Sequence, residues 1–148
     1  LDFMKTIIQR VSHAEVIVKN RVLGSIQSGL VVFLGVGPND THHQVVAMVD
    51  KILRLRIFND NKGKMNFNLI DINGSLLVVS QFTLYGDCLK GNRPSFIKAA
   101  DRVHAKKIYN EFVNYIVQQK INVETGKFGA DMQVSLTNMG PATFTLEV

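Results

Sequence analysis

The chain has 148 residues, which fits one domain with a core large enough to fold without disulfides or structural metals. Its single cysteine, Cys88, excludes an internal disulfide and an all-cysteine metal cluster, and it favours a reducing, cytoplasmic compartment. The longest apolar run is far short of the ~20 residues that cross a bilayer, and the net charge of +5 favours a polyanionic partner, RNA in particular.

The first third of the chain predicts short β-strands. Residues 1–3 precede Met4 without a signal-peptide cleavage pattern, and we interpret them as a remnant added to the native start. Strands are expected over residues 5–11, 14–19, 23–27 and 29–35. The last of these segments is continuously apolar and rich in β-branched residues, a pattern typical of a buried central strand.

The first long helix is predicted over residues 41–56. Thr41 and Gln44 fit a capping box, in which each side chain accepts a hydrogen bond from the other residue's backbone N–H. The apolar side chains that follow fall on one helical face. After this helix we expect a strand beginning at residues 57–58, a polar loop over 59–68 and a turn over 71–74.

Residues 76–84 predict a strongly apolar strand that ends in polar groups. Alternate side chains of a strand share a face, so Ser80 and Phe82 would lie on one face and Gln81 and Thr83 on the other. A strand end that is polar on both faces either opens into a functional site or emerges into solvent. The pattern alone favours neither interpretation.

Basic residues follow this strand in an irregular loop. Lys90 and Arg93 flank a glycine, and Pro94 is expected to open a short helical segment. Flexible basic loops and helix N-termini both attract phosphates, so this loop is a candidate contact to RNA, with a solvated loop as the equal alternative. Lys64, in the earlier polar loop, has the same two interpretations, and there the solvated loop is favoured.

The second long helix is predicted over residues 101–120, which carry a clean apolar stripe. Closing strands are expected over residues 122–125, 132–137 and 142–147, with turns over 126–129 and 139–141. The predicted fold class is α+β. A mainly antiparallel, strongly curved or barrel-like β-sheet is expected, with two long helices, in one domain over residues 1–148.

The Gly140-Pro141 pair stands out because only three prolines occur in the chain. Proline fixes φ and lacks a backbone donor, and X-Pro is the one bond at which a cis peptide costs little. A Gly-Pro peptide can therefore hold two carbonyl oxygens in a fixed direction, which suits a site that reads shape with backbone atoms. From the residues alone, a plain turn before a strand is the favoured alternative.

Catalytic triads, metals and cofactors find little support. Ser80 and Thr83 are candidate nucleophiles, but a hydroxyl needs an adjacent base, and a hidden triad stays open without support. The histidines are His13, His42, His43 and His104. None lies in a nucleophile-elbow context, and the last three are interpreted as surface residues near helix starts. No motif has metal-ligand or dinucleotide-binding spacing, so no metal and no cofactor are expected.

Seven short blocks, taken in order, resemble the D-aminoacyl-tRNA deacylase family of the D-tyrosyl-tRNA deacylase type. The blocks are IQRVS at 8–12, LRIF at 55–58, GKMN at 63–66, SQFTL at 80–84, KGxRPSF at 90–96, TGxFGA at 125–130 and NxGPxT at 138–143, where x marks a position outside the match. Asn92, Met139 and Ala142 depart from the residues common in the family, which bears on substrate preference rather than on the activity. Each block alone is weak, but together they span the chain from Met4 onward.

The resemblance implies a homodimer that hydrolyses the ester of D-aminoacyl-tRNA, and glycyl-tRNA as well, with the site at the interface. It implies catalytic positions at Ser80, Gln81, Phe82 and Thr83, with backbone N–H groups that stabilise the oxyanion. It also implies a cis Gly140-Pro141 peptide that enters the partner's pocket and rejects L side chains. The implied substrate-binding positions are Asn138, Gly140, Pro141 and Thr143, and the implied tRNA-binding positions are Lys90, Arg93 and Lys64.

Two questions stay open, one about the mechanism and one about the function. The nucleophile is either Thr83 or a water activated by the 2′-hydroxyl of the terminal adenosine, and the second fits better because no base accompanies Thr83. Two other functions remain as alternatives. One is a non-catalytic RNA-binding accessory protein, and the other is a hydrolase of small D-amino esters without RNA.

Overall fold

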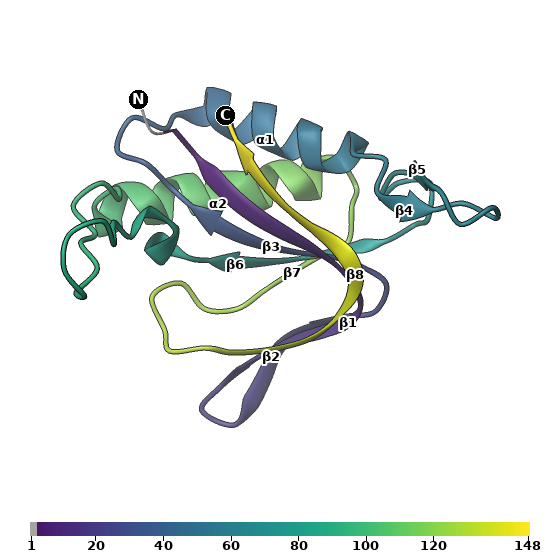
Figure 1. The fold of residues 1–148 in the computed structure, drawn as a ribbon, viewed down its shortest axis with the longest axis horizontal. Helices are drawn as coiled ribbons and strands as arrows, with labels where there is room; N and C mark the ends of the chain where they lie inside the picture. Colours follow the sequence, from purple (N-terminus) through teal and green to yellow (C-terminus); the bar gives the residue numbers. More distant parts are fainter. Residues whose placement is uncertain (1–2) are drawn as a thin grey trace.

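A computed structural model describes residues 3–148 as a strongly curved mixed sheet with two helices packed against one face (Figure 1). Residues 1 and 2, most of the segment interpreted as a remnant, lie outside the described part. The strands are β1 (Lys5–Val18), β2 (Arg21–Ile26), β3 (Gly29–Gly35), β4 (Phe58–Asn59), β5 (Met65–Phe67), β6 (Ser75–Ser80), β7 (Val123–Thr125) and β8 (Gln133–Glu147). The helices are α1 (His42–Arg54), the 3₁₀ helix η1 (Phe82–Tyr85) and α2 (Arg102–Gln118).

The main sheet has the order β2-β1-β3-β6-β7, and β8 pairs with β1. All pairs made by β1 are antiparallel, whereas β3–β6 and β6–β7 are parallel. The parallel pairs follow from the connections, because α1 joins β3 to β6 and α2 joins β6 to β7. A helical crossover returns the next strand in the same direction as the first. The predicted α+β class with a curved sheet is confirmed, and the sheet is mixed.

The sheet rolls until its outer strands approach each other. A Cβ atom built on Gly24 of β2 would lie 2.5 Å from the carbonyl oxygen of Thr125 in β7. Only glycine permits so close an approach of the two backbones. The predicted barrel-like curvature is therefore present in the structure.

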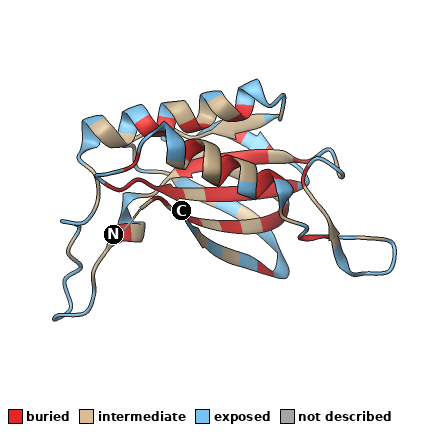
Figure 2. Cartoon of the chain, turned by 90° about the horizontal axis from the view of Figure 1, so that it is seen from above, coloured by how far each residue is buried: buried red, intermediate tan, exposed pale blue. Residues whose placement is uncertain are grey.

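The two faces of the sheet bury different clusters. Side-chain alternation in β3 sends Leu30 and Val32 toward the helices and Val31 to the opposite face. The helices contribute Met48, Ile52 and Phe112 among others to the first cluster. Figure 2 shows buried residues concentrated on the strands and on the helix sides that face them. Within residues 3–148, neither helix has both the length and the apolar character needed to cross a bilayer.

Two long strands replace pairs of predicted short ones. β1 runs unbroken where strands over 5–11 and 14–19 were expected, and β8 runs through the predicted turn over 139–141. The prediction of that turn was wrong because β1 and β8 pair with each other on both sides of it. Irregularities in register around Val11 absorb the bend without ending either strand.

Two local predictions between β6 and α2 were also wrong. The strand expected over 76–84 ends at Ser80, because its neighbour β3 ends at Gly35 and offers no further backbone partners. No helix forms at Pro94, because the next residue, Ser95, exchanges both backbone hydrogen bonds with Asp87 in an isolated bridge.

Candidate active site

A cavity of about 570 Å³ opens at the end of β6. We call it the main cavity. Its lining comes from the ends of β3 and β6, from η1, from the segment that leads into α2, and from the segment that leads into β8. Its volume lies in the range of small-molecule sites. The lining residues used below are Ser80, Gln81, Phe82, Phe96, Arg102 and Asp131.

The chain turns sharply where β6 ends. The N–H of Gln81 donates to the carbonyl oxygen of Leu34 at 2.7 Å, the last bond between these neighbouring strands. The backbone then enters η1, whose first N–H groups have no intrahelical acceptor. Within the described residues, the N–H groups of Phe82 and Thr83 donate to no protein acceptor. Two adjacent backbone donors are thus available beside the main cavity.

The side chains at this turn supply no general base. The amide of Gln81 donates a short hydrogen bond to the hydroxyl of Thr83. Thr83 does not itself line the main cavity, whereas Ser80, Gln81 and Phe82 do. Among the described lining residues, Asp131 is the one carboxylate and no histidine occurs. The prediction that Ser80 and Phe82 share one strand face, with Gln81 and Thr83 on the other, was wrong. Residues 82–85 form a 3₁₀ helix, in which side chains do not alternate between two faces.

Two phenylalanines stand at the mouth of the main cavity. Phe82 is 55% exposed and Phe96 is 39% exposed. Their rings meet edge to face, with centroids 5.2 Å apart and an interplanar angle of 71°. Large exposed aromatic groups at a cavity mouth suit contact with a flat ligand or with a second chain. Phe96 belongs to one of the seven sequence blocks, but no role was assigned to it.

The Gly140-Pro141 peptide is cis, and both residues are exposed in the part of β8 whose register with β1 is irregular. We call this part of β8 the bend; the strand curves strongly in Figure 1. Asn138 in this bend pairs with Val11 of β1. Ser80 pairs with Leu34 of β3, which in turn pairs with Thr6 of β1, so Ser80 lies at the level of Thr6. Thr6 and Val11 are five residues apart in β1, so at about 3.3 Å per residue Ser80 and Asn138 are separated by roughly 17 Å along the strand direction. Gly140 and Pro141 do not line the main cavity of their own chain.

Hydrogen bonds from β1 hold the bend in place. The guanidinium of Arg10, only 7% exposed, donates to the carbonyl oxygen of Met139 at 3.1 Å and to that of Ile57 at 2.7 Å. The amide of Asn138 donates to the carbonyl oxygens of Arg10 and Ala142. The backbone on both sides of Gly140-Pro141 is therefore fixed by side chains. Arg10 lay in a recognised block but was not predicted as a site residue.

Thr143, the last of the predicted substrate-binding positions, lies past the bend. Its hydroxyl accepts a hydrogen bond from the amide of Gln9 at 3.1 Å. It is thereby tied to β1 and points to no cavity wall of its own chain. Together with Asn138, it belongs to the support of the bend in the described structure.

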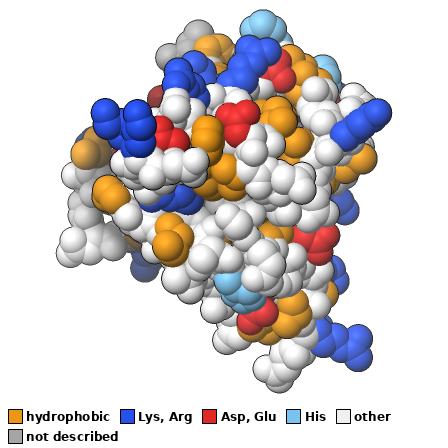
Figure 3. All heavy atoms as spheres, turned by 90° about the vertical axis from the view of Figure 1, so that its right-hand side faces the viewer, with side chains coloured by type: hydrophobic (Ala, Val, Ile, Leu, Met, Phe, Trp, Pro, Cys, Tyr) orange, Lys and Arg blue, Asp and Glu red, His pale blue; other side chains and the backbone are white. Residues whose placement is uncertain are grey.

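The three predicted tRNA-binding residues do not form one cluster. Lys90 and Arg93 are exposed in the loop between η1 and α2, on the side of the main cavity. Lys64 lies in the β4–β5 hairpin, at the opposite end of the molecule (Figure 1). Figure 3, which looks onto the right-hand side of the molecule as drawn in Figure 1, shows Lys and Arg side chains in separate groups between apolar patches.

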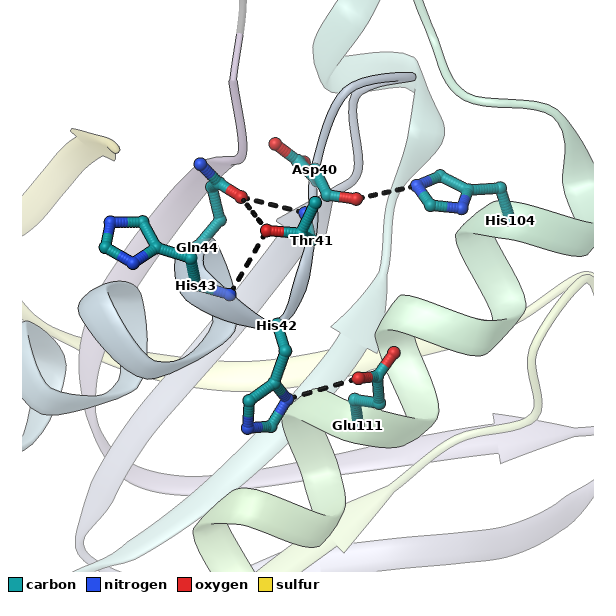
Figure 4. A network of polar contacts seen from close by, with 7 residues as sticks. All are labelled: Asp40, Thr41, His42, His43, Gln44, His104 and Glu111. Atoms are coloured by element: carbon teal, nitrogen blue, oxygen red, sulfur yellow. Dashed lines mark hydrogen bonds and ion pairs between the residues drawn. The ribbon is translucent and has the colours of Figure 1, made fainter.

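Two histidines, His42 and His104, make contacts around the helix starts, and neither lines the main cavity (Figure 4). The Nδ1 atom of His42 lies 3.1 Å from Oε1 of Glu111, which links α1 to α2. The Nε2 atom of His104 lies 2.8 Å from the carbonyl oxygen of Asp40, so this ring is partly buried rather than a free surface group. Thr41 and Gln44 form the predicted capping box.

Asp40 supports the end of β3 that faces the main cavity. Its buried carboxylate accepts hydrogen bonds from the N–H groups of Met4 at 2.9 Å and Gly37 at 2.7 Å. Burial raises the pKa of Asp40 above its usual value, although these two bonds and the charge of His104 act in the opposite direction. Among the described residues, no group of three acidic, histidine or cysteine side chains could hold a metal ion.

Comparisons with known proteins match nearly the whole chain. A family model described as D-Tyr-tRNA(Tyr) deacylase matches residues 7–147. Two proteins named D-aminoacyl-tRNA deacylase, from Thermosipho africanus and Desulfatibacillum aliphaticivorans, are 54% and 53% identical over 144 residues. Each alignment covers 97% of this chain, with 97% of the first protein and 99% of the second.

Two solved structures have closely similar folds. One, described as c-Myc DNA Unwinding Element Binding Protein, has a TM-score of 0.91 at 39% identity and covers 97% of this chain and 98% of its own. Another is described as a "probable eukaryotic D-amino acid tRNA deacylase". It has a TM-score of 0.85 at 16% identity and covers 98% of this chain and 99% of its own, which shows a shared fold.

Proposed function

The chain belongs to the D-Tyr-tRNA(Tyr) deacylase family, and on that premise we propose that it hydrolyses the ester of D-aminoacyl-tRNA to free D-amino acid and tRNA. One observation carries the proposal: beside the main cavity, the N–H groups of Phe82 and Thr83 have no acceptor in the described part of the chain. Such a donor pair binds the oxyanion that forms when an ester carbonyl is attacked. The substrate class implies a cytoplasmic enzyme.

The proposed reaction uses backbone donors rather than a side-chain nucleophile. Water adds to the ester carbonyl carbon, and the carbonyl oxygen becomes an oxyanion bound by Phe82 and Thr83 N–H. When the intermediate collapses, the bond from the acyl carbon to the ribose 3′ oxygen breaks, and that oxygen takes up the proton that the attacking water loses. Each donor of this kind contributes about 100- to 1,000-fold in rate. The 2′-hydroxyl of the terminal ribose orients the water, since the cavity has no histidine and the Thr83 hydroxyl accepts from Gln81.

Chirality is read, in this proposal, by the main chain of a second protomer. Gly140 and Pro141 are exposed and do not line the main cavity of their own chain, so in this proposal they reach a cavity across a homodimer contact. Arg10 and Asn138 keep this backbone rigid. Its carbonyl oxygens would bind the substrate's amino group and leave no space for an L side chain. Glycyl-tRNA would also be accepted, because glycine has no side chain to reject.

The decisive assay compares D-tyrosyl-tRNA, L-tyrosyl-tRNA and a free D-tyrosine ester under multiple-turnover conditions. Rapid loss of the D-tyrosyl-tRNA ester alone is the expected result. Binding of tRNA without turnover would instead select an RNA-binding accessory protein. Equal rates on the free ester would select a small-ester hydrolase.

Sedimentation tests the assembly independently. The proposal expects a dimer at micromolar concentration, with Met139, which is 46% exposed in the single chain, buried at the contact. A monomer at that concentration would remove the route by which the Gly-Pro backbone reaches a cavity. Activity of such a monomer toward D-tyrosyl-tRNA would leave the hydrolysis proposal standing and reject the gate alone.

A further inference from the structure

A second cavity of about 550 Å³ adjoins the main cavity. We call it the basic cavity. The two cavities share one wall, formed by Arg102 and the segment that runs from Phe128 to Asp131. The outer wall adds Val18, Lys19 and Lys127. Three cationic side chains thus surround the basic cavity against one carboxylate, that of Asp131.

These three cations come from separate elements of the fold. Lys19 lies in the turn between β1 and β2, Arg102 is the first residue of α2, and Lys127 precedes β8. Within the described residues, none of the three has an ion pair or a side-chain hydrogen-bond acceptor. Surface lysines are commonly solvated one by one, whereas here three unpaired cations meet around one hollow. Such an arrangement attracts an anion strongly.

The guanidinium of Arg102 lies against a glycine on the shared wall. Gly129 has φ +76°, and a Cβ atom built on it would lie 2.6 Å from Nη2 of Arg102. The guanidinium therefore lies directly over a backbone that no side chain covers. Its planar set of donors suits two oxygens of one phosphate group. Arg102 lies on the wall that the two cavities share, where a nucleotide strand that occupied both cavities would pass.

We infer that the basic cavity binds the phosphodiester backbone of the single-stranded 3′ end of the tRNA, next to a terminal nucleoside in the main cavity. This inference rests on the proposed function and extends it. Arg102 binds the phosphate nearest the main cavity, and Lys19 and Lys127 bind the next part of the strand. The ester then lies at the Phe82 and Thr83 donors, beside the main cavity.

The test separates contacts to phosphate from contacts to the ester. Lys19→Gln/Lys127→Gln and Arg102→Gln are assayed on D-tyrosyl-tRNA and on D-tyrosyl-adenosine, which has the same ester but no phosphate. We expect the ratio of kcat/KM for the tRNA to kcat/KM for the nucleoside ester to fall about tenfold in both variants at low salt. The matched control is Lys51→Gln/Arg54→Gln, which removes two cations from the last turn of α1, away from both cavities.

Binding of uncharged tRNA gives a readout that does not depend on hydrolysis. In a salt titration, the slope of log Kobs against log salt should decrease by about 0.7 for each phosphate that the variant no longer neutralises. An unchanged slope together with an unchanged substrate ratio would overturn the inference. If the wild type hydrolyses neither ester, the proposed function fails, and the salt slopes still decide whether the basic cavity binds RNA.

Discussion

The two ends of one curved sheet use the backbone in opposite ways. At the end of β6, the N–H groups of Phe82 and Thr83 have no acceptor among residues 3–148 and lie beside a cavity. At the bend of β8, Arg10 and Asn138 bind the main chain on both sides of Gly140-Pro141. A site that must stabilise new charge needs free donors, whereas a site that must reject a shape needs a rigid surface. The free donors of Phe82 and Thr83 lie beside a cavity of their own chain, whereas the rigid backbone at Gly140-Pro141 does not line the main cavity of its own chain.

Removing the support of the bend should have the largest effect. Arg10→Met takes away the guanidinium that binds the carbonyl oxygens of Met139 and Ile57. Displacement of a positioning group by about 1 Å can cost roughly 100-fold in rate, so we expect kcat/KM on D-tyrosyl-tRNA to fall about that much. Single-turnover assays and a thermal melt would measure rate and folding separately.

Arg56→Met is the matched control for that variant. Arg56 also donates to a backbone carbonyl, that of Asn66 at 3.0 Å, but it is exposed and does not contact the bend. A folded Arg10→Met protein with the wild-type rate would show that rigidity of the bend is not needed. If Arg10→Met does not fold, Arg10→Lys retains one donor to the same carbonyls and allows the same comparison.

Loosening the bend itself should have a smaller and more selective effect. Pro141→Ala restores a free φ and a backbone N–H at the proposed reading surface. We expect the D-to-L ratio of kcat/KM on tyrosyl-tRNA to fall about tenfold, while hydrolysis of glycyl-tRNA changes little. Pro38→Ala, at an exposed loop position, is the matched control. Equal D-to-L ratios in Pro141→Ala and wild type would count against backbone reading.

At the other end of the sheet, a side-chain change should have a smaller effect again. Thr83→Ala deletes the hydroxyl but keeps the N–H that we assign to the oxyanion, so kcat should stay within about threefold of wild type. A nucleophilic hydroxyl would behave differently, because its removal abolishes a covalent route. A loss of about 1,000-fold or more in burst-phase kinetics would therefore restore Thr83 as the nucleophile.

The smallest expected effect is a pH dependence of stability that arises from Asp40, the buried carboxylate that follows β3. The pKa of Asp40 is raised in the folded protein, mainly by burial, so the folded state favours its protonated form. The contribution of this group to stability is then complete below pH 3.8 and is lost as the pH rises through the raised value.

Urea unfolding at a series of pH values would measure that signal. The free energy of unfolding of the wild type, taken relative to Asp40→Asn, should decrease as the pH rises above 3.8. An increase over the same interval would mean that hydrogen bonds from Met4 and Gly37 outweigh burial.

Local chemistry was sufficient to predict much of the fold. The capping box of Thr41 and Gln44 lies within one helical turn, and the apolar stripes of α1 and α2 repeat every three to four residues. The continuous apolar run of β3 likewise marked a buried strand with its observed bounds, Gly29–Gly35. These signals are complete within short windows of sequence, so they survive without knowledge of neighbours.

Contacts between distant segments decided where β6 and β8 end and which side chains meet, and short stretches of sequence do not contain that information. β8 runs through Gly140-Pro141 because β1, more than a hundred residues earlier, supplies its hydrogen bonds, and β6 stops at Ser80 because β3 stops beside it. The sequence did not predict a role for Arg102, because its place against Gly129 and between two cavities is created by segments far apart in the chain. The sequence by itself determined the helices, the buried strand and the family of this protein. Only the fold decided which backbone groups stay unpaired and which cations meet, because each depends on contacts between residues far apart in the chain.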